Sequence, residues 1–210
     1  MRPENEPEGQ DRELSFIEKA RRTQIIGAAA AVIAEDGIGQ ASLARIAKRA
    51  GVSKGVVSYH FAGKDELMTQ VVLAVYEAGA HAMAPAIQAA TTPREHLAAY
   101  LRSNVAYIAA NPEALRAVIE IVSGYSPEGG GRLFEPGADE PIADHLVELF
   151  RRGQEDGSFR DFDPLVMAHT VRGAIDVIAP RAVRHPEIDL AAYAEELVAL
   201  FDAATRGESP

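Results

Sequence analysis

The residues from Ser53 to Tyr59 combine groups that can bind a polyanion with groups that can read the edge of a base. Ser53 can donate its hydroxyl, together with the backbone amides at the start of a helix, to a phosphate. Lys54 can reach a phosphate or a guanine edge, whereas Val56 offers only apolar contact, such as that with a thymine methyl group. Glycine lets a backbone approach a ligand closely. We interpret this segment as a nucleic-acid contact whose presented residues are Ser53, Lys54, Gly55, Val56, Ser58 and Tyr59.

Charge is divided unevenly along the chain. The 210 residues carry a formal net charge of −10, which taken alone argues against a partner made of phosphates. Residues 18–64, however, hold eight basic and three acidic residues, a net charge of +5, while residues 1–17 carry −3 and residues 65–210 carry −12. A basic segment on an acidic body would orient a protein on DNA, because phosphates attract one and repel the other. Chance segregation of charge is the alternative.

Two short helices joined by a tight turn are needed to hold the candidate contact residues. Ser42 can cap a helix that Gly51 ends by adopting a left-handed conformation, and Ser53 can cap a second helix that runs to about His60. Residues 42–61 therefore fit a helix-turn-helix, in which only the second helix is free to enter the major groove. The apolar residues that would hold the two helices together are Leu43, Ile46, Ala47, Val52 and Val57.

Helical periodicity covers most of the remaining chain. A first helix is predicted from Phe16 to Asp36, and a long linking helix from Lys64 to about Met83. Further helices are predicted at residues 93–110, 112–122, 142–154, 164–183 and 190–204, with a flexible Gly- and Pro-rich loop at residues 123–141. Because no stretch alternates like a strand, we expect an all-α fold of about nine helices, with an N-terminal three-helix domain and a larger helical C-terminal domain.

The run from Arg21 to Met68 resembles the N-terminal domain of TetR-type (TetR/AcrR) transcriptional regulators over its whole length. Its most specific parts are IAKRAGVSKG at residues 46–55 and YHFAGKDELM at residues 59–68, and it makes up about a quarter of the chain. The rest is similar only in its helical character. The resemblance implies a homodimer that binds a palindromic operator in double-stranded DNA, usually represses transcription, and releases DNA when a small molecule enters the C-terminal domain.

Carried over by position, the resemblance implies contacts with the DNA backbone outside the first set. Tyr59 and His60 would meet the backbone, and Lys64 and Thr23 would each hold a phosphate. Many members of the family have two adjacent aromatic residues where this chain has Ser58 and Tyr59. Only Tyr59 therefore keeps the aromatic contact.

Some of these residues have a structural alternative. His60 could be a packing residue, and Lys64 a solvated lysine, although a cation at a helix N-terminus is mildly unfavourable without an external anion. Tyr59 could belong to the core, as we expect for Phe61. Two polar residues of the first short helix are retained as further DNA contacts, Ser42 and Arg45.

The domain boundaries follow from composition and from the resemblance. We expect a disordered acidic tail at residues 1–17, a DNA-binding domain at residues 19–79, a helical effector-binding and dimerisation domain at residues 80–205, and a tail at residues 206–210. The chain contains no cysteine, which excludes disulfides and thiolate metal sites. No apolar run reaches the ~20 residues that span a bilayer, so we expect a cytoplasmic, nucleoid-associated protein.

The last two predicted long helices suit a dimer interface. Each has an apolar stripe edged by small residues, and two such helices from each subunit would form a four-helix interface. The same stripes could instead be the internal core of a monomer, which periodicity alone does not exclude. Their residues are Met167, Val171, Ala174, Ile175 and Ile178, followed by Tyr193, Leu197, Leu200 and Phe201.

An effector pocket is expected within the C-terminal domain, mostly apolar with a few polar groups. No cofactor and no metal are expected, only a small-molecule effector of unknown identity. The polar candidates are Tyr76, Tyr100, Asn104, Tyr107, Glu120, Tyr125, His145, His169, Arg172 and Asp176.

Other classes of protein fit the sequence less well. An enzyme is not expected, because the chain has no Gly-rich phosphate loop, HExxH motif or nucleophile elbow. A helical adaptor that binds only protein would not need the basic segment. A DNA-binding protein without an effector fits the sequence as well as an effector-controlled one does, so this alternative stays open.

Overall fold

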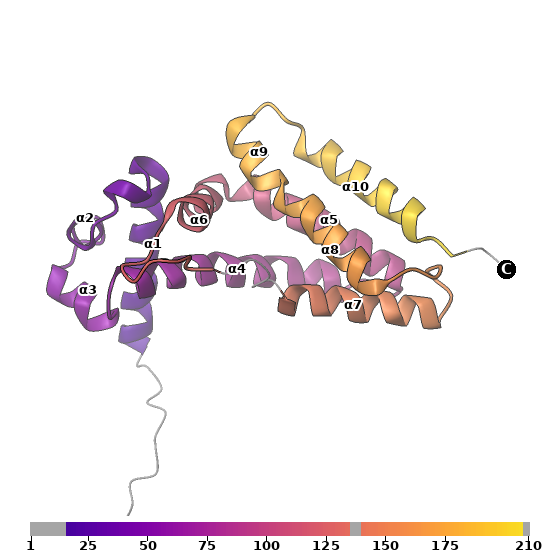
Figure 1. Ribbon diagram of the computed structural model, residues 1–210, viewed down its shortest axis with the longest axis horizontal. Helices are drawn as coiled ribbons and strands as arrows, with labels where there is room; N and C mark the ends of the chain where they lie inside the picture. Colours follow the sequence, from indigo (N-terminus) through magenta and orange to yellow (C-terminus); the bar gives the residue numbers. More distant parts are fainter. Residues whose placement is uncertain (1–15, 135–139, 208–210) are drawn as a thin grey trace, which may run out of the picture.

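A computed structural model describes residues 16–134 and 140–207 as an elongated helical protein (Figure 1). The first three helices form one end of the molecule, and α4 runs from that end along the body. Helices α5 and α6 pack on α4, and the remaining helices pack on α5 and α6 or on each other. Among the described residues, extended pairing is confined to one isolated bridge between Phe159 and Arg206. The predicted all-α class is confirmed. The predicted tails and the predicted loop lie partly outside the described residues, at positions 1–15, 135–139 and 208–210.

The N-terminal helices begin and end close to the predicted residues. Helix α1 extends over Phe16–Asp36, and a short 3-10 helix, η1 (Ile38–Gln40), follows it without any signal in the sequence pattern. Helix α2 (Leu43–Arg49) and helix α3 (Lys54–His60) are capped by Ser42 and Ser53. Gly51 lies between them with a φ of 66°, the left-handed conformation that glycine adopts without steric cost.

Helix α4 extends over Lys64–Gln88, so the predicted end near Met83 is wrong. Pro85 lies inside its last turns, where the proline ring removes one backbone donor. The Pro85 carbonyl still accepts the amide of Ala89 at 3.1 Å, which lets the helix continue for another turn. The predicted boundary between domains, at residues 79 and 80, therefore falls inside one continuous helix.

The helices of the body start at prolines and caps. Helix α5 (Pro93–Ala110) begins with a capping box, in which Thr92 and Glu95 each accept a backbone amide of the other. Helices α6 (Pro112–Gly124), α7 (Glu140–Glu155) and α10 (Leu190–Thr205) agree with the predicted spans to within about two residues at each end.

The single helix predicted at residues 164–183 is wrong, because the structure has two helices there. Helix α8 (Pro164–Asp176) ends before Val177, and helix α9 (Ile178–Arg184) begins after it. Pro180 has no amide to donate to the carbonyl of Asp176, and its ring would collide with that carbonyl in a continuous helix. The break turns α9 away from α8 and toward α6 (Figure 1).

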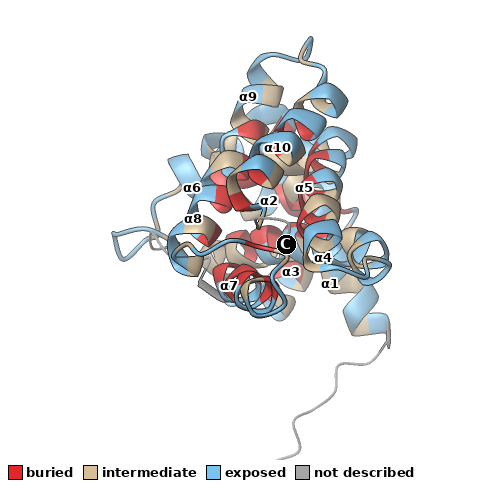
Figure 2. Ribbon diagram, turned by 90° about the vertical axis from the view of Figure 1, so that its right-hand side faces the viewer, coloured by how far each residue is buried: buried red, intermediate tan, exposed pale blue. Residues whose placement is uncertain are grey.

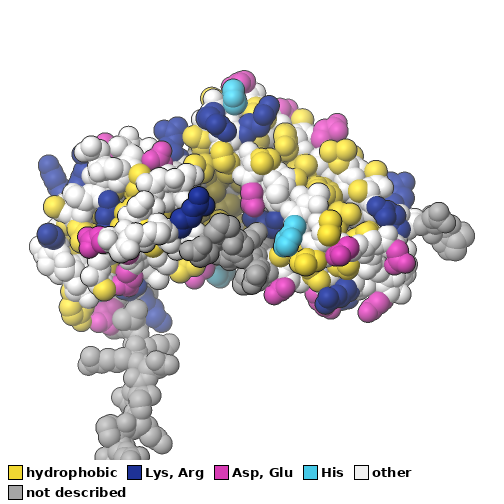
Figure 3. All heavy atoms as spheres, in the orientation of Figure 1, with side chains coloured by type: hydrophobic (Ala, Val, Ile, Leu, Met, Phe, Trp, Pro, Cys, Tyr) yellow, Lys and Arg dark blue, Asp and Glu magenta, His cyan; other side chains and the backbone are white. Residues whose placement is uncertain are grey.

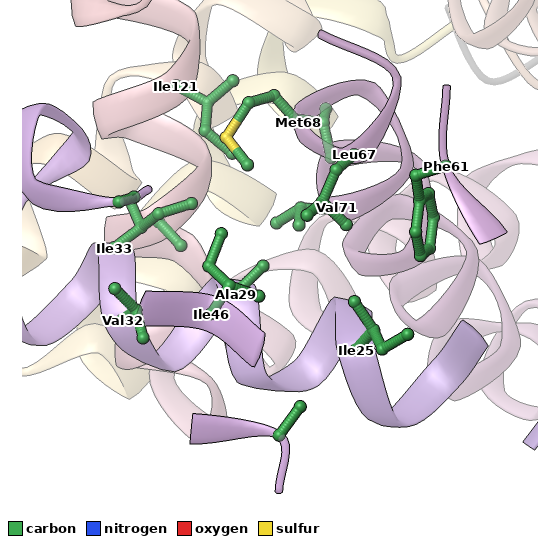
Figure 4. Close-up of a cluster of buried hydrophobic side chains, with 14 of the residues drawn as sticks. Ile25, Ala29, Val32, Ile33, Ile46, Phe61, Leu67, Met68, Val71 and Ile121 are labelled. Carbon is green, nitrogen blue, oxygen red and sulfur yellow. The ribbon is translucent and has the colours of Figure 1, made fainter. Parts of the chain in front are cut away.

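The buried side chains form two cores, and Figure 2 marks the buried residues along the helices. The first joins α1 to α4 and also takes in Ala117, Val118 and Ile121 of α6; Figure 4 shows Ile121 facing the side chains of α1 and α4. The second joins α5 and α7 to α10, and Leu115 packs against both. Helix α6, which the sequence places in the C-terminal domain, thus packs with the N-terminal helices.

Most of the apolar stripe on the last two predicted helices belongs to the core of this one chain. Val171, Ile175, Ile178, Leu197 and Phe201 are all at least nine-tenths buried, which favours the alternative of an internal core for these positions. The exposed apolar side chains of the same region are Leu165, Val166, Val177 and Leu200, at 50%, 62%, 56% and 62% exposure.

No helix in the described ranges combines the length and the apolar character that crossing a membrane requires.

Candidate nucleic-acid interface

Helix α3 presents one polar face to solvent and buries the other. Ser53, Lys54, Gly55, Ser58 and Tyr59 are exposed, and Figure 3 shows both basic and acidic side chains at this end of the molecule. The Tyr59 side chain is 75% exposed, so it is not a core residue. An aromatic ring held this far out of the core is available to a partner.

The opposite face of α3 explains how so short a helix is held in place. Val57 is fully buried, and it packs in the same core as Ile46 and Ala47 of α2. Phe61, directly after α3, is 2% exposed and lies among the side chains of α1 and α4 (Figure 4). The expectation that Phe61 is a core residue is confirmed.

Arg22 of α1 holds the C-terminal end of α3 in position, a role that the sequence pattern does not predict. Its guanidinium donates to the backbone carbonyl of His60, lies 4.4 Å from the centre of the Phe61 ring, and pairs with Glu66 at 3.3 Å. Glu66 in turn accepts the amide of Ala62 at 2.6 Å. Arg22 thus positions α3 against both α1 and α4, through contacts 38 to 44 residues apart in sequence, a separation that no local pattern reports.

Two residues near the end of α3 differ in how they meet the surface. The Tyr59 hydroxyl donates to Glu18 of α1 at 3.4 Å, a carboxylate oxygen occupying a position that a phosphate oxygen could take. His60 is half-buried and lies edge-on to the Tyr59 ring at 5.0 Å. The backbone carbonyl of His60 accepts the hydrogen bond from Arg22 of α1, and the imidazole ring of His60 lies beside Tyr59.

Gly55 has no structural need to be glycine. Its φ is not positive, and a Cβ added there would meet only the Ser53 hydroxyl oxygen, at 3.7 Å. Glycine inside a helix costs about 0.5–1 kcal/mol relative to alanine. A glycine that the fold does not require, on the exposed face of α3, is consistent with the close approach of a ligand.

Three other predicted contacts lie on α1 and α2. The Ser42 oxygen accepts the amide of Arg45 at 3.2 Å as the cap of α2. The exposed Arg45 guanidinium pairs with Asp36 at 2.7 Å, an exposed pair of small energy that a phosphate could displace. The Thr23 hydroxyl is exposed and donates to the carbonyl of Lys19 at 3.0 Å within α1.

Lys64 lies in a different environment from the other basic candidates. Its ammonium is 3.3 Å from the carbonyl oxygen of Ile38 and 5.2 Å from the centre of the Tyr125 ring. Burial lowers the pKa of Lys64, and Asp65 only partly offsets this. A phosphate would have to compete with the Ile38 carbonyl for this lysine.

Five of the predicted effector residues come together between α4, α5 and α8. Arg172 donates to the Tyr100 hydroxyl at 3.0 Å and to Asp176 at 2.5 Å, and Asn104 donates to the Tyr100 carbonyl at 2.8 Å. Tyr76 interacts electrostatically with the Arg172 guanidinium. We refer to Tyr76, Tyr100, Asn104, Arg172 and Asp176 as the arginine cluster.

The other five predicted effector residues are scattered. Tyr107 donates to the carbonyl of Val75 at 2.8 Å, and Tyr125 bonds to Asp65, which together with burial raises the pKa of Tyr125. His145 and His169 are exposed. Glu120 accepts the amide of Ile38 at 3.5 Å.

A surface cleft of about 560 Å³ lies between α1, α6 and α9, and Glu120 is the one predicted effector residue among those that line it. Ile119 and Val183 contribute apolar surface to it, and Arg116 and Arg184 contribute positive charge. The cleft and the arginine cluster share no residue.

Known proteins resemble this chain most clearly at its N-terminal end. A sequence model of the bacterial regulatory proteins of the tetR family matches residues 25–71. The HTH-type transcriptional regulator BetI 1 of Chromohalobacter salexigens is 39% identical over 92 residues, which cover 42% of this chain and 44% of that protein. The match thus spans less than half the length of that relative.

Two further proteins extend the similarity beyond the N-terminal helices. The solved structure of FadR from Bacillus subtilis in complex with stearoyl-CoA has a TM-score of 0.73 at 22% identity, covering 86% of this chain and 97% of that one, and it shows a shared fold. The HTH-type transcriptional regulator BetI of Stenotrophomonas maltophilia is 36% identical over 140 residues, which cover 65% of this chain and 70% of that protein. With that identity over more than two thirds of a relative, this chain belongs to the TetR family of bacterial regulatory proteins.

Proposed function

We propose that this protein is a transcriptional regulator that binds a palindromic operator as a homodimer, represses transcription, and is released from DNA by a small-molecule effector. The observation that carries the proposal is the exposed face of α3, where Tyr59 is 75% exposed while Val57 and Phe61 anchor the helix in the core. Its named relatives in Chromohalobacter and Stenotrophomonas are HTH-type transcriptional regulators. We propose no catalytic role and no cofactor other than the effector.

On DNA, α3 would lie in the major groove with its N-terminal end toward the bases. Ser53 and Tyr59 would grip phosphates, while Lys54 and Val56 would face base edges, and Gly55 would let the two backbones come close. Because α3 offers few polar side chains to the bases, we expect most of the affinity for DNA to come from phosphate contacts and to depend strongly on salt concentration.

The homodimer is supported by apolar side chains that the single chain leaves exposed. Val166 on α8 and Leu200 on α10 are each 62% exposed, and Leu165 and Val177 are at least half exposed. Hydrophobic side chains reach the surface over this part of the body in Figure 3. Large apolar side chains that a single chain leaves exposed are ones that a protein partner would cover.

DNA binding is tested by fluorescence anisotropy with the DNA that flanks the gene of this protein, at salt concentrations from 50 to about 200 mM. We expect the affinity to fall steeply over this range, by about 10³-fold if six phosphates are contacted. Absence of binding at low salt, or binding that does not respond to salt, would contradict the proposal.

Substitutions distinguish the residues that bind phosphates from the residues that recognise bases. Tyr59→Ala should weaken binding to every DNA sequence alike, whereas Lys54→Ala or Val56→Ala should change the preferred sequence, with about 1–3 kcal/mol at the affected base pair. Thr69→Ala on α4, which removes a hydroxyl that donates to the Asp65 carbonyl, is the matched control. If all three α3 variants weaken every sequence equally, the division of roles is wrong.

A further inference from the structure

The arginine cluster contains a buried positive charge whose donors are not all used. Arg172 is 7% exposed, and its Nε is the buried side-chain nitrogen or oxygen that has no hydrogen-bond partner among the described residues. A buried donor without an acceptor costs roughly 1–3 kcal/mol, more when the group is charged. Leucine or methionine on α8 would fill the same space without that cost, so packing alone does not explain an arginine at this position.

The guanidinium is held in a set orientation. Its Nη1 donates to the Tyr100 hydroxyl at 3.0 Å, and its Nη2 donates to the Asp176 carboxylate at 2.5 Å. Asn104, also buried, donates to the Tyr100 carbonyl one helical turn earlier in α5. Burial works against the charge on Arg172, but Tyr100 and Asp176 outweigh it, so its pKa lies above the ordinary value and the group is a cation.

Asp176 shows which chemistry the guanidinium accepts. Its carboxylate accepts from Nη2 of the guanidinium, and its side chain is 53% exposed. A half-exposed carboxylate is stabilised by water as well as by its partner, so it can be released at small cost. Tyr76, on α4, is 50% exposed, so two members of the cluster, Tyr76 and Asp176, reach the surface beside the buried guanidinium.

We propose that the arginine cluster binds the carboxylate of the effector, and that the effector is a small monocarboxylic acid. Guanidinium and carboxylate form paired hydrogen bonds across the Nε and Nη edge, which supplies the missing acceptor. The single positive charge of Arg172 is already paired with Asp176, so it matches an effector with one negative charge better than an effector with two. This inference rests on the proposed effector-controlled function and names the class of its effector.

The test uses the full chain, without DNA, and straight-chain acids from butyrate to octanoate together with benzoate. Each acid is paired with its neutral amide, which has the same shape and lacks the charge. Calorimetric titration and the shift in Tm measure binding. At least one acid should bind, and its amide should bind about ten- to hundredfold more weakly, since a hydrogen bond to a charged group is worth about 1.5–3 kcal/mol.

Variants assign the binding to this cluster. Arg172→Gln should lose the acid by about the same factor as the amide does, Tyr100→Phe should lose less, and Asp176→Asn should bind the acid more tightly because it removes the competing carboxylate. Arg181→Gln, at an exposed arginine of α9, is the control and should bind unchanged. If circular dichroism shows that Arg172→Gln does not fold, the opposite effects of Tyr100→Phe and Asp176→Asn carry the test.

Three results would overturn the inference. The first is that none of the acids binds, the second is that an acid and its amide bind equally, and the third is that Arg172→Gln keeps the affinity of the parent for the acid. In each case Nε would be hydrogen-bonded by a water molecule instead of an effector. Salt-sensitive DNA binding measured on the same preparation separates this failure from failure of the proposed function. If DNA binding is intact and the acids have no effect, only the effector class is wrong.

Discussion

At the scale of single residues, the exposed face of α3, which we propose to face DNA, consists mostly of side chains that lie outside the core. Tyr59 is held out of the core, Ser58 and Lys54 are exposed, and Gly55 has neither a positive φ nor a crowded neighbour. By contrast, Val57 and Phe61 are buried, and Val56 is partly buried against the same core. Residues that lower the stability of the fold or add nothing to it are expected at a binding surface, where function and not folding selects the residue type.

Gly55→Ala is expected to stabilise the protein and weaken DNA binding. The added methyl group meets only the Ser53 oxygen, at 3.7 Å, and alanine is the better helix former by about 0.5–1 kcal/mol. The same methyl group would stand between α3 and a DNA strand. Thermal unfolding and anisotropy measure the two effects, and Gly55→Leu extends the series, with still weaker binding. Unchanged DNA affinity in the leucine variant would show that no strand comes near this position.

At the scale of elements, α3 is only seven residues long, far below the ~12–15 residues at which an isolated helix becomes marginally stable. It depends on its cap, on Val57 and on Arg22. The cap oxygen of Ser53 accepts the amide of Val56 at 3.2 Å, and Arg22 binds the carbonyl at the other end. Each end of the helix is thus held by one side chain.

Replacing Ser53 separates the cap from the phosphate contact. Ser53→Asp should retain the stability of the parent, because aspartate caps helices as well as serine does, whereas Ser53→Ala should lose about 1 kcal/mol. The aspartate should nevertheless abolish DNA binding, because it places a negative charge against the phosphates. Thr92→Asp is the matched control, at the cap of α5. If Ser53→Asp binds DNA like the parent, Ser53 does not face the backbone.

The pairing of α5 with α7 predicts a pH-dependent stability. His96 and His145 face each other with their Nε2 atoms 3.4 Å apart, and burial, followed by His145 and Arg152, lowers the pKa of His96. The unfolded chain therefore binds more protons than the folded one below the unperturbed histidine pKa, and stability is lost as the pH falls from about 7 toward 5. His96→Gln should flatten this loss in Tm measured across the range. His169→Gln, at an exposed histidine, should leave it unchanged, and an unaltered pH profile in His96→Gln would refute the assignment.

At the scale of the whole molecule, α6 joins the DNA-binding end to the body. Its buried face belongs to the first core, and its exposed side lines the cleft shared with α1 and α9. Glu120 on α6 accepts the amide of Ile38, and Lys64 donates to the carbonyl of the same residue. The short segment between α1 and α2 is therefore bonded to both α4 and α6, and Leu115 of α6 packs against both cores.

The proposed dimer predicts that exposed apolar residues of α8 and α10 are essential for assembly. Val166→Glu and Leu200→Glu, each at a position 62% exposed in the single chain, should leave the monomer folded and weaken dimerisation by at least about tenfold, since each burial contributes about 1.5–3 kcal/mol. Sedimentation velocity measures the oligomer, and operator affinity should fall with it. Leu73→Glu on α4, 42% exposed, is the control. Dimers that persist in both variants would place the interface elsewhere.

Local signals in the sequence predict most helices of this protein. Ser42, Ser53 and Thr92 act as caps, and Gly51 adopts the conformation that a turn between two short helices needs. The sequence pattern is less informative at prolines. Pro85 lies inside the continuous helix α4, whereas Pro180 lies in the first turn of α9, just after the break that separates α9 from α8. Both have the same local effect on the backbone, and packing decides which helix bends.

The sequence alone determines the helix-turn-helix and its exposed face, because caps, turn glycine and apolar spacing act within a few residues of each other. Contacts between distant residues are decided by the tertiary structure. It buries Val171 and Ile175 inside one chain, brings α6 to the N-terminal core, attaches Arg22 to the end of α3, and gathers Arg172, Tyr100 and Asp176 into one cluster. Helical periodicity gives the face on which a side chain lies, but only packing in three dimensions decides which surface covers that face.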